Sequence, residues 1–473
     1  MKSLTLRVRR SPSRAPASGT WLGKSSQHFV FYTLLVFLVA CVLGGGSNRT
    51  TTLSLLYLRP VTVICLFAML LLPAERDWRQ VRAPLVLLGL LAATMLVQLI
   101  PLPPSVWNRL PGHAPLVGAM VALGGEQPWR PISLTPDFTI NSLLSLLVPL
   151  TVLVGFAGIR PDQRLALIPL MIGVAVSSAV LGIVQFPGGA DSPANLYSYS
   201  LPVPNGWFAN RNHHAAFLAC ALVLISVWLQ FPVRSHRHRI QRYGLAGLAA
   251  LLLLAVVIAT GSRTGTLLAL LTLIYTATVT FHSHGKLTKR TALVLLAVVI
   301  AALTLVGVML ISGRAVSFTR LFAFDPDAEQ RVRALPTLLA MLRDFLPVGS
   351  GFGSFDLVFR MYEPDAMLHP GYFNHAHDDW LELGITGGLP ALAVLLLFVL
   401  WVTVRLVRSF GQPASVTVRG AQAGGIILLV LGAASISDYP LRTSLLAAFL
   451  ALACAWLADV PENGAVLRSG DAW

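Results

Sequence analysis

Apolar runs of about 20 residues recur along the whole chain, and they restrict its fold more than any other feature. A helix rises about 1.5 Å per residue, so roughly 20 apolar residues cross a hydrocarbon core about 30 Å thick. Hydrophobic residues make up 55% of the 473 residues, and charged residues only 12%. The sequence therefore predicts an all-α polytopic membrane protein rather than a set of soluble domains.

The apolar runs predict about twelve transmembrane helices, with both termini on the same side of the membrane. They are expected near residues 28–46, 52–72, 84–100, 138–158, 165–186, 208–231, 243–260, 265–281, 291–312, 380–403, 420–437 and 443–459. Residues 1–27 are interpreted as a tail rather than a signal peptide, because no small-residue cleavage site follows the first run. The rest divides into a transmembrane region 28–200, a second transmembrane region 201–459 and a C-terminal tail 460–473.

The net charge of +15 is explained by the orientation of the chain in the membrane. Most of the 35 Lys and Arg residues fall in the tail and short loops on the N-terminal side. Short loops rich in Lys and Arg stay in the cytoplasm, so both tails are predicted to be cytoplasmic. Residues 313–378, the longest interval without a span in the second half, then form a large periplasmic loop. No nucleic acid partner is needed to explain the charge.

Two arginines of this loop, Arg331 and Arg333, lie on a helix predicted over about 328–345. Alone they would most often belong to a solvated helix face. Gly349, Gly351 and Gly353 follow the helix, but no strand precedes them, so a nucleotide-binding glycine loop is not expected.

The loop closes on two histidines, His375 and His377, which are followed by Asp378 and Asp379. A one-residue spacing cannot place both histidines on one face of a helix, and no cysteine or third clear ligand accompanies them. A metal site is therefore not expected. A neutral histidine beside a carboxylate is better suited to act as a general base, since an unperturbed histidine titrates near pH 6.5.

Arg263 stands in a five-residue break, Gly-Ser-Arg-Thr-Gly, between two apolar runs. One interpretation is an arginine that snorkels from a tight turn. The other is an anion site, because the flanking glycines allow close backbone approach and the turn opens a helix whose N-terminus favours anions.

The order of these pieces resembles the bacterial O-antigen ligase and polymerase superfamily, which are membrane glycosyltransferases that use polyprenyl-diphosphate-linked sugars. The matching motifs are QLIPLPP at 98–104, PISL at 131–134, NRNH at 210–213, GSR at 261–263, Arg331 ahead of Asp344 and the glycine turn, and AHDDWL at 376–381. They extend over most of the chain.

The resemblance implies a GT-C-like fold and names site residues. Arginines like Arg263 and Arg331 hold the diphosphate, and a histidine like His377 activates the acceptor hydroxyl. Further substrate-binding candidates are Arg211, Asn212, His213, Arg333, His375 and Asp378. The chain departs from the family at two positions, with Asp378 in place of the usual asparagine and Thr386 in place of the usual glutamate. No metal or cofactor is expected.

The function implied is transfer of a glycan from an undecaprenyl-diphosphate carrier to an acceptor hydroxyl, with inversion, on the periplasmic face of the bacterial inner membrane. The acceptor is a saccharide, a lipid A core or a protein. Within the superfamily the alternatives are a polysaccharide (Wzy-type) polymerase and a protein O-oligosaccharyltransferase. Outside it they are a small-anion transporter, which would be expected to show broken helices in paired halves, and a non-catalytic assembly partner.

Overall fold

The chain is helical throughout the part that its computed structural model describes, which comprises residues 21–47, 53–188, 192–197, 203–233, 235–284, 326–368 and 373–460. One antiparallel ribbon, in which β1 (Pro101–Leu102) pairs with β2 (Arg130–Pro131), interrupts the helices. The helices are α1 (Trp21–Gly44), α2 (Leu55–Leu71), α3 (Trp78–Gln98), α4 (Pro104–Trp107), α5 (Ala114–Ala122), α6 (Pro136–Ser145), α7 (Leu147–Gly158), α8 (Pro161–Gly188), α9 (Arg211–Trp228), α10 (His236–Thr260), α11 (Arg263–His284), α14 (Pro326–Phe345), α15 (Phe355–Tyr362), α16 (Asp379–Phe410), α17 (Val416–Ala434) and α18 (Ser444–Ala458), with 3-10 turns η2 (Asp365–Met367) and η3 (Pro440–Arg442).

Seven segments of the described chain are long and apolar enough to cross a membrane. They are α1, α3, α6 together with α7, α8, α10, α16 and α17. The helices α2 and α18 are apolar but shorter, and α9 and α11 occupy two more of the predicted positions. The predicted span 291–312 lies outside the described residues. A multi-pass all-α membrane protein is thus confirmed, while the number of twelve spans stays a prediction.

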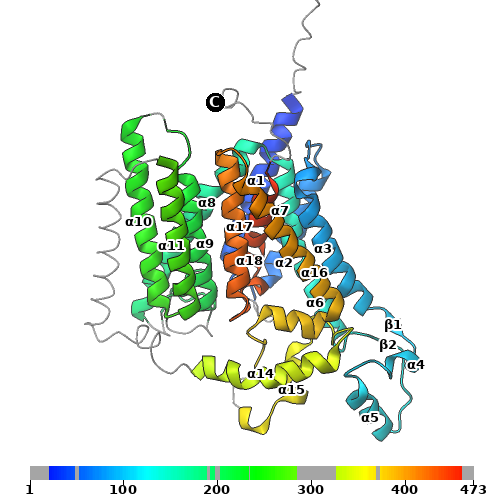
Figure 1. Ribbon diagram of the computed structural model, residues 1–473. Coiled ribbons are helices and arrows are strands. Elements are labelled where there is room, and N and C mark those ends of the chain that lie inside the picture. The colour runs from blue at the N-terminus through cyan, green and yellow to red at the C-terminus, as the bar shows by residue number, and fades with distance from the viewer. Residues whose placement is uncertain are drawn as a thin grey trace, which may run out of the picture.

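The helices α9 and α18 form the centre of the bundle (Figure 1). Residues 213–227 of α9 are all buried, and this helix packs against α8, α10, α11 and α17. Both central helices are rich in alanine, and small residues let helix backbones approach closely inside a membrane. Gly424 of α17 marks such an approach, because a Cβ there would lie 2.5 Å from the carbonyl oxygen of Ala453.

Helix ends gather at two opposite faces of the bundle. At one face, Arg164 of α8 pairs with Asp459, just after α18, at 3.0 Å. Arg405 of α16 donates a hydrogen bond to the carbonyl of Ala458 at 2.7 Å. At the other face lie α14 and α15 (Figure 1).

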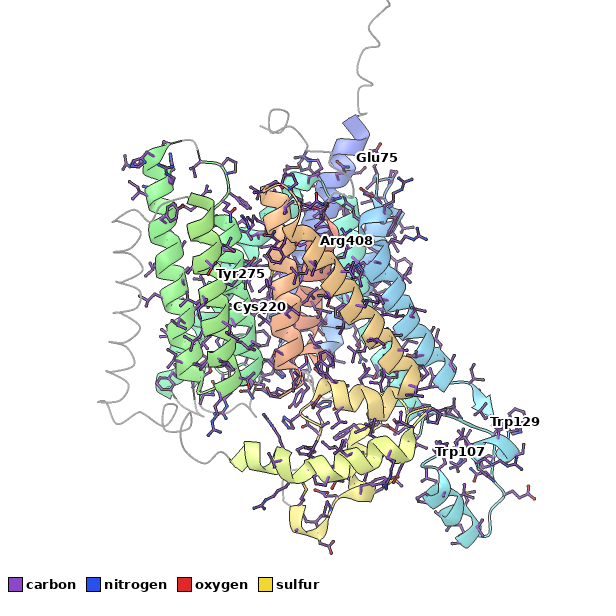
Figure 2. All side chains as sticks on the ribbon, in the orientation of Figure 1. Glu75, Trp107, Trp129, Cys220, Tyr275 and Arg408 are labelled. Carbon is purple, nitrogen blue, oxygen red and sulfur yellow. The ribbon has the colours of Figure 1, made fainter. Side chains whose placement is uncertain are left out.

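The side chains drawn in Figure 2 follow the same division. Glu75 and Arg408 lie toward the first face, and Trp107 and Trp129 lie beyond the second. Segments that the charge pattern predicts to be cytoplasmic therefore share a face, and α14 lies at the opposite one. The compartment that each face meets stays a prediction.

A break in α16 at Gly388 (φ 65°) separates a short first part of the helix from its long apolar remainder. Pro390 has no N–H to donate to the carbonyl of Thr386, and the N–H of Leu389 bonds to a carbonyl outside the helix at 2.8 Å. The carbonyls of Ile385 and Thr386 are consequently open to other donors.

The glycine turn at 349–353 uses these carbonyls. The N–H of Gly351 donates to Thr386 at 2.9 Å, and the side chain of Gln98 donates to the same carbonyl at 2.9 Å. Gly351 has φ 104°, and a Cβ there would lie 2.2 Å from the hydroxyl of Ser133, so the position requires glycine. The turn is a structural clamp that fixes the start of α16 against α3.

Candidate active site

The segment 435–443, between α17 and α18, lies at the centre of the candidate site. It carries Asp438, whose side chain is 4% exposed, and the buried Tyr439. The predicted spans end and begin on either side of these residues, so they stand at the margin of the membrane. An ionised carboxylate there is unfavourable unless it is paired, and its partners therefore identify the site.

The start of α9 supplies the first partners of Asp438. Asn210 caps this helix by accepting a hydrogen bond from the backbone N–H of Asn212 at 2.8 Å. The side-chain amide of Asn210 also donates to Oδ2 of Asp438 at 3.4 Å. The side-chain amide of Asn212 donates to Oδ2 of Asp438 at 2.6 Å, and Nε2 of His213 lies 3.7 Å from Oδ1.

His377 and Arg331 approach the same carboxylate from two other segments. Nδ1 of His377 lies 3.4 Å from Oδ1 of Asp438, and Nη2 of Arg331, on α14, lies 3.8 Å from Oδ2. Arg331 also donates to the carbonyl of Ser437 at 2.6 Å. We call Asn210, Asn212, His213, Arg331, His377 and Asp438 the Asp438 cluster.

The electrostatics of this cluster keep Asp438 ionised. Burial alone raises the pKa of Asp438, but the contacts with His213 and His377 outweigh burial and hold the pKa well below its usual range. Within the described chain, buried nitrogens without a hydrogen-bond partner include Nδ1 of His213 and Nε of Arg331. Buried polar atoms are rarely left unpaired, so these nitrogens suit a ligand rich in acceptor oxygens.

The turn that carries Arg263 reaches the same segment. Gly261, in the left-handed conformation (φ 67°), ends α10, and Arg263 begins α11. The hydroxyl of Thr264 shares a hydrogen bond with that of Ser437 at 2.9 Å. Arg263 is therefore held beside the segment that carries Asp438.

Two further predicted arginines are placed differently from each other. Arg211 is buried, with 7% of its surface exposed, at the first position of α9, where its neighbours contact Asp438. Arg333 is exposed on α14. Residues two apart on a helix point to different faces, so Arg333 does not share the orientation of Arg331.

A second network lies beside the first and centres on Glu382, whose side chain is 1% exposed. Its carboxylate lies 3.1 Å from Nδ1 of His375 and 3.1 Å from Nη2 of Arg442. Arg442 also contacts Asp379 at 3.0 Å, and Asp379 accepts a hydrogen bond from Ser435 at 3.1 Å. We call His375, Asp379, Glu382, Ser435 and Arg442 the Glu382 cluster.

Tyr439 joins the two clusters. Its ring centroid lies 4.8 Å from that of His377, 5.2 Å from that of His213 and 4.5 Å from that of His375. Burial, with the negative charge of Asp438, raises the pKa of Tyr439, so the phenol stays protonated. The aromatic ring thus holds all three imidazoles in fixed positions.

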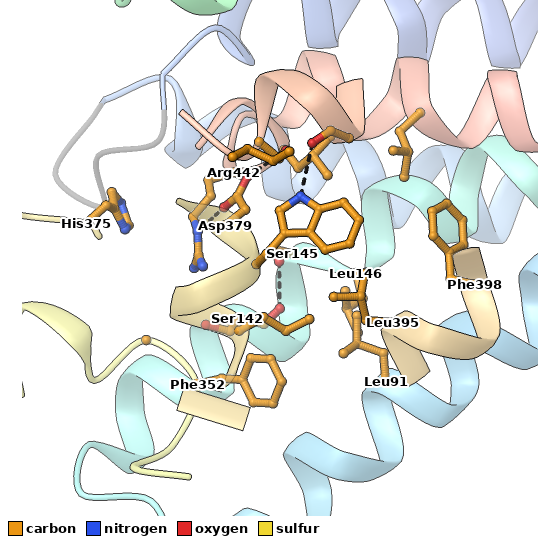
Figure 3. A pocket seen from close by; sticks show the side chains of 18 of the residues that line it. Leu91, Ser142, Ser145, Leu146, Phe352, His375, Asp379, Leu395, Phe398 and Arg442 are labelled. Atoms are coloured by element: carbon orange, nitrogen blue, oxygen red, sulfur yellow. Dashed lines mark hydrogen bonds and ion pairs between the residues drawn. The ribbon is translucent and has the colours of Figure 1, made fainter. Parts of the chain in front are cut away.

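A cavity of about 680 Å³ opens beside the Glu382 cluster. Figure 3 shows His375, Asp379 and Arg442 toward one side of it and Leu395 and Phe398 toward the other. The walls come from α3, α6, α16, α17 and α18 and are mostly apolar. No member of the Asp438 cluster lines this cavity.

The structure places most of the predicted site residues around the segment 435–443. Asn212, His213, Arg331 and His377 contact it directly, and Arg263 and Arg211 lie next to residues that do. Asp378 instead caps α16, where its carboxylate accepts from two backbone N–H groups at 2.9 and 3.0 Å. The carboxylates beside the two histidines are therefore Asp438 and Glu382, and not the neighbours in sequence, Asp378 and Asp379.

Sequence reasoning missed Asp438, Tyr439, Glu382 and Arg442. A usable signal was present, because Asp438 and Arg442 are ionisable residues in a very short connection between two apolar runs. Glu382 gave no such signal, because it lies in the first turns of a predicted span.

No group of three or more His, Cys, Asp or Glu side chains is arranged to hold a metal ion within the residues described above. Independence of a metal stays a prediction of the sequence, to be tested with chelators.

Comparison with known proteins finds a family domain in one part of the chain. Residues 248–396 match the family model described as O-antigen ligase, and no curated protein matches the chain. The matched stretch includes Arg263, Arg331 and His377, and it ends before Asp438. The match assigns an O-antigen ligase domain to residues 248–396, and this domain supports membership of the chain in the O-antigen ligase and polymerase superfamily.

Proposed function

We propose that this protein transfers a glycan from an undecaprenyl-diphosphate carrier to an acceptor hydroxyl, without a metal and with inversion at the anomeric carbon. The observation that carries the proposal is the convergence of His377, Arg331 and the start of α9 on the buried carboxylate of Asp438. A non-catalytic assembly protein has no need to gather a base, a carboxylate and arginines at one membrane margin.

The arginines of this site suit a diphosphate. Arg331 donates to the carbonyl of Ser437, and the turn that carries Arg263 reaches the same residue through Thr264. A guanidinium can grip two phosphate oxygens at once, and fixed cations stabilise the charge that develops as the diphosphate leaves. Arg211, Asn212 and His213 are the further residues proposed to bind the donor.

His377 is the proposed general base, and Asp438 is the carboxylate that positions it. Nδ1 of His377 faces Asp438, so Nε2 is the atom that receives the acceptor proton. The acceptor oxygen then bonds to the anomeric carbon as the bond from that carbon to the phosphate oxygen breaks. The electron pair leaves on the diphosphate, and Asp438 stabilises the imidazolium that forms.

The region 201–459 is the proposed catalytic region, and 28–200 supports it through Gln98 and Ser133. We place the protein in the bacterial inner membrane, with α14 on the periplasmic side and both tails in the cytoplasm. Cysteines introduced at Pro326 and Pro193 should then react with an impermeant thiol reagent added outside, and one at His236 should not. The four native cysteines are buried and provide a low background. Labelling at position 236 in intact cells would reverse the orientation.

Transfer itself is tested with purified protein in proteoliposomes that contain a glycan linked to undecaprenyl diphosphate. The expected result is a glycosylated acceptor of inverted anomeric configuration and release of undecaprenyl diphosphate. Movement of an anion across the membrane with no change in the carrier would favour the transporter instead.

A further inference from the structure

The connection between α9 and α10 lies at the first face of the bundle, where Arg164 pairs with Asp459. The start of α9 and the turn after α10 both meet the segment 435–443 at the other face, through Asn212 and Thr264. The two helices pack against each other (Figure 1), so their remaining ends meet at the first face. This connection is therefore separated from the Asp438 cluster by the length of α9, about 27 Å for a helix of 18 residues.

A cavity of about 290 Å³ is formed at this connection. Its cationic lining residues are Arg239 and Arg242, about one turn apart on α10, and Gln230 and Tyr243 add polar groups. The other lining residues are the apolar ones of the stretch 229–233. We call this cavity the α9–α10 groove. It combines positive charge, hydrogen-bonding groups and a hydrocarbon surface.

The two arginines of the groove contact groups that do not neutralise them. Arg242 donates to the carbonyl of Phe231 at 2.5 Å, and its guanidinium carbon lies 5.9 Å from the ring centroid of Trp228. Arg239 is exposed, and its Nη2 lies 3.0 Å from Nδ1 of His236. A carbonyl or an imidazole orients a guanidinium without cancelling its charge, and arginine stays protonated in proteins. Both positive charges thus remain available to an anion.

No carboxylate of the neighbouring sequence balances these charges. The stretch 192–324 contains no Asp or Glu, and it includes all of α9, α10 and α11. The helix α8, which also packs against α9 and α10, has Asp162 in its first turn, but that carboxylate is paired with Arg160. An anion from outside the chain would supply the missing negative charge.

The surroundings of the groove favour the phosphate of a lipid over a free anion. Leu229, Phe231 and Val233 place hydrocarbon beside the arginines. Leu245 and Leu248, which are 58% and 64% exposed, continue an apolar surface along α10 toward the middle of the bundle. A phospholipid matches both parts, because its phosphodiester carries acyl chains, and basic pockets between transmembrane helices bind such head groups. A free phosphate would leave the apolar residues uncovered.

We propose that the α9–α10 groove binds the head group of an anionic phospholipid from the leaflet at the first face. Arg239 and Arg242 pair with the phosphodiester, and Gln230 and Tyr243 bond to the oxygens of the glycerol. The acyl chains lie along α10. The bound lipid links the end of α9 to the start of α10. This site takes no part in glycan transfer, so it does not depend on the proposed reaction.

The class of ligand is tested by native mass spectrometry of the full-length protein. Dioleoyl phosphatidylglycerol should bind at least about tenfold more tightly than dioleoyl phosphatidylcholine, because two arginines face its net negative charge. Equal affinity for the two lipids would contradict the proposal. Sodium phosphate at the same concentration should not displace phosphatidylglycerol. Displacement would assign the groove to a soluble phosphate and would overturn the lipid assignment.

Matched variants on one helix separate the groove from general charge. Arg239→Glu and Arg242→Gln should each lower the affinity for phosphatidylglycerol about tenfold, and glutamine can still donate to the carbonyls that hold Arg242. Arg237→Glu is the control, because Arg237 is exposed in the first turn of α10 and does not line the groove. Equal losses in Arg237→Glu and Arg239→Glu would show attraction to the whole basic face and contradict a defined site. Since Arg239 is exposed, this pair decides the question even if Arg242→Gln does not fold.

The position of the lipid is tested by photolabelling in nanodiscs, with a phosphatidylglycerol that carries a diazirine in its head group. Crosslinks should fall on residues 229–243 of the wild-type protein and should be lost in Arg239→Glu. Crosslinks confined to the segment 435–443 would place the anion beside Arg331 instead and would overturn the proposal.

Discussion

The Asp438 and Glu382 clusters contain the same kinds of residue, but they differ in how many of their polar groups have hydrogen-bond partners. Each has a buried carboxylate and a histidine, and the histidines His377 and His375 pack against the same ring, Tyr439. Glu382 is bonded to an imidazole, a guanidinium and the backbone N–H of Ala376. In the Asp438 cluster, Nδ1 of His213 and Nε of Arg331 are buried without a hydrogen-bond partner among the described residues.

We interpret the Glu382 cluster as one that stabilises the fold and the Asp438 cluster as one that binds substrate and reacts. A fully bonded polar network is rigid and holds the elements that contribute to it. A network with unpaired donors is prepared for a ligand whose oxygens complete it. Loss of a residue from the Glu382 cluster should therefore lower stability first, and loss from the Asp438 cluster should lower binding or catalysis first.

The largest effect on stability is expected from Arg442→Ala. It leaves Glu382 and Asp379 buried without their shared cation, and breaking such a pair costs about 3–5 kcal/mol. Thermal unfolding in detergent measures the change. Arg343→Ala is the control, because its contact with Asp344 is largely exposed and should contribute little. A similar thermal unfolding midpoint for both variants would contradict the stabilising role of the Glu382 cluster.

A smaller effect, confined to donor binding, is expected from Arg331→Ala and Arg263→Ala. A hydrogen bond to a charged group contributes about 1.5–3 kcal/mol, so affinity for the lipid diphosphate should fall roughly 10- to 100-fold. Arg263→Lys should recover only part of it, because lysine lacks the planar fork. Arg333→Ala is the matched control on α14. An equal loss of donor affinity in this variant would show that the positive charge of the helix, and not the position of Arg331, attracts the diphosphate.

A comparable or smaller loss, of about 1–3 kcal/mol in stability, is expected from Gly351→Ala, because alanine is strained at φ 104° and its Cβ meets Ser133. Gly89→Ala, on an open stretch of α3, should not destabilise the protein. The two unfolding midpoints and the donor affinity of each folded variant are the measurements. Unchanged stability in Gly351→Ala would contradict the role of the turn as a clamp.

The smallest effect is expected from chelation. EDTA should leave transfer unchanged, because the leaving group is already a stabilised diphosphate and the arginines carry its charge. Transfer rates with and without EDTA test this. A loss that one divalent ion restores would replace the arginine-based account with a metal-dependent one.

The sequence predicted the scaffold well because membrane spans are local features. Runs of apolar residues located α1, α3, α8, α10 and α16 without any knowledge of their neighbours. The helix predicted over about 328–345 is α14, and it carries Arg331 into the site. The glycine residues at 349–353 were recognised, but their contact with Gln98 is separated by about 250 residues in sequence and has no local signature.

The partners of the histidines were the part that the sequence did not reveal. Asp378 and Asp379 are adjacent to His377, and proximity in sequence suggested that they would orient it. Asp378 is used to cap α16, and Asp379 pairs with Arg442. The carboxylate beside His377 is that of Asp438. Asp438 lies between α17 and α18, outside the matched domain, and the packing of these helices places it beside His377.

Single-turnover transfer by His377→Ala, measured together with its affinity for the lipid diphosphate, tests the central claim most directly. We expect donor affinity to be preserved and the chemical step to slow by about 100- to 10,000-fold, as for loss of a general base. His375→Ala, at saturating acceptor, should be slowed less. Near wild-type transfer by His377→Ala would contradict the account, and a complete loss in His375→Ala alone would assign the base to the Glu382 cluster.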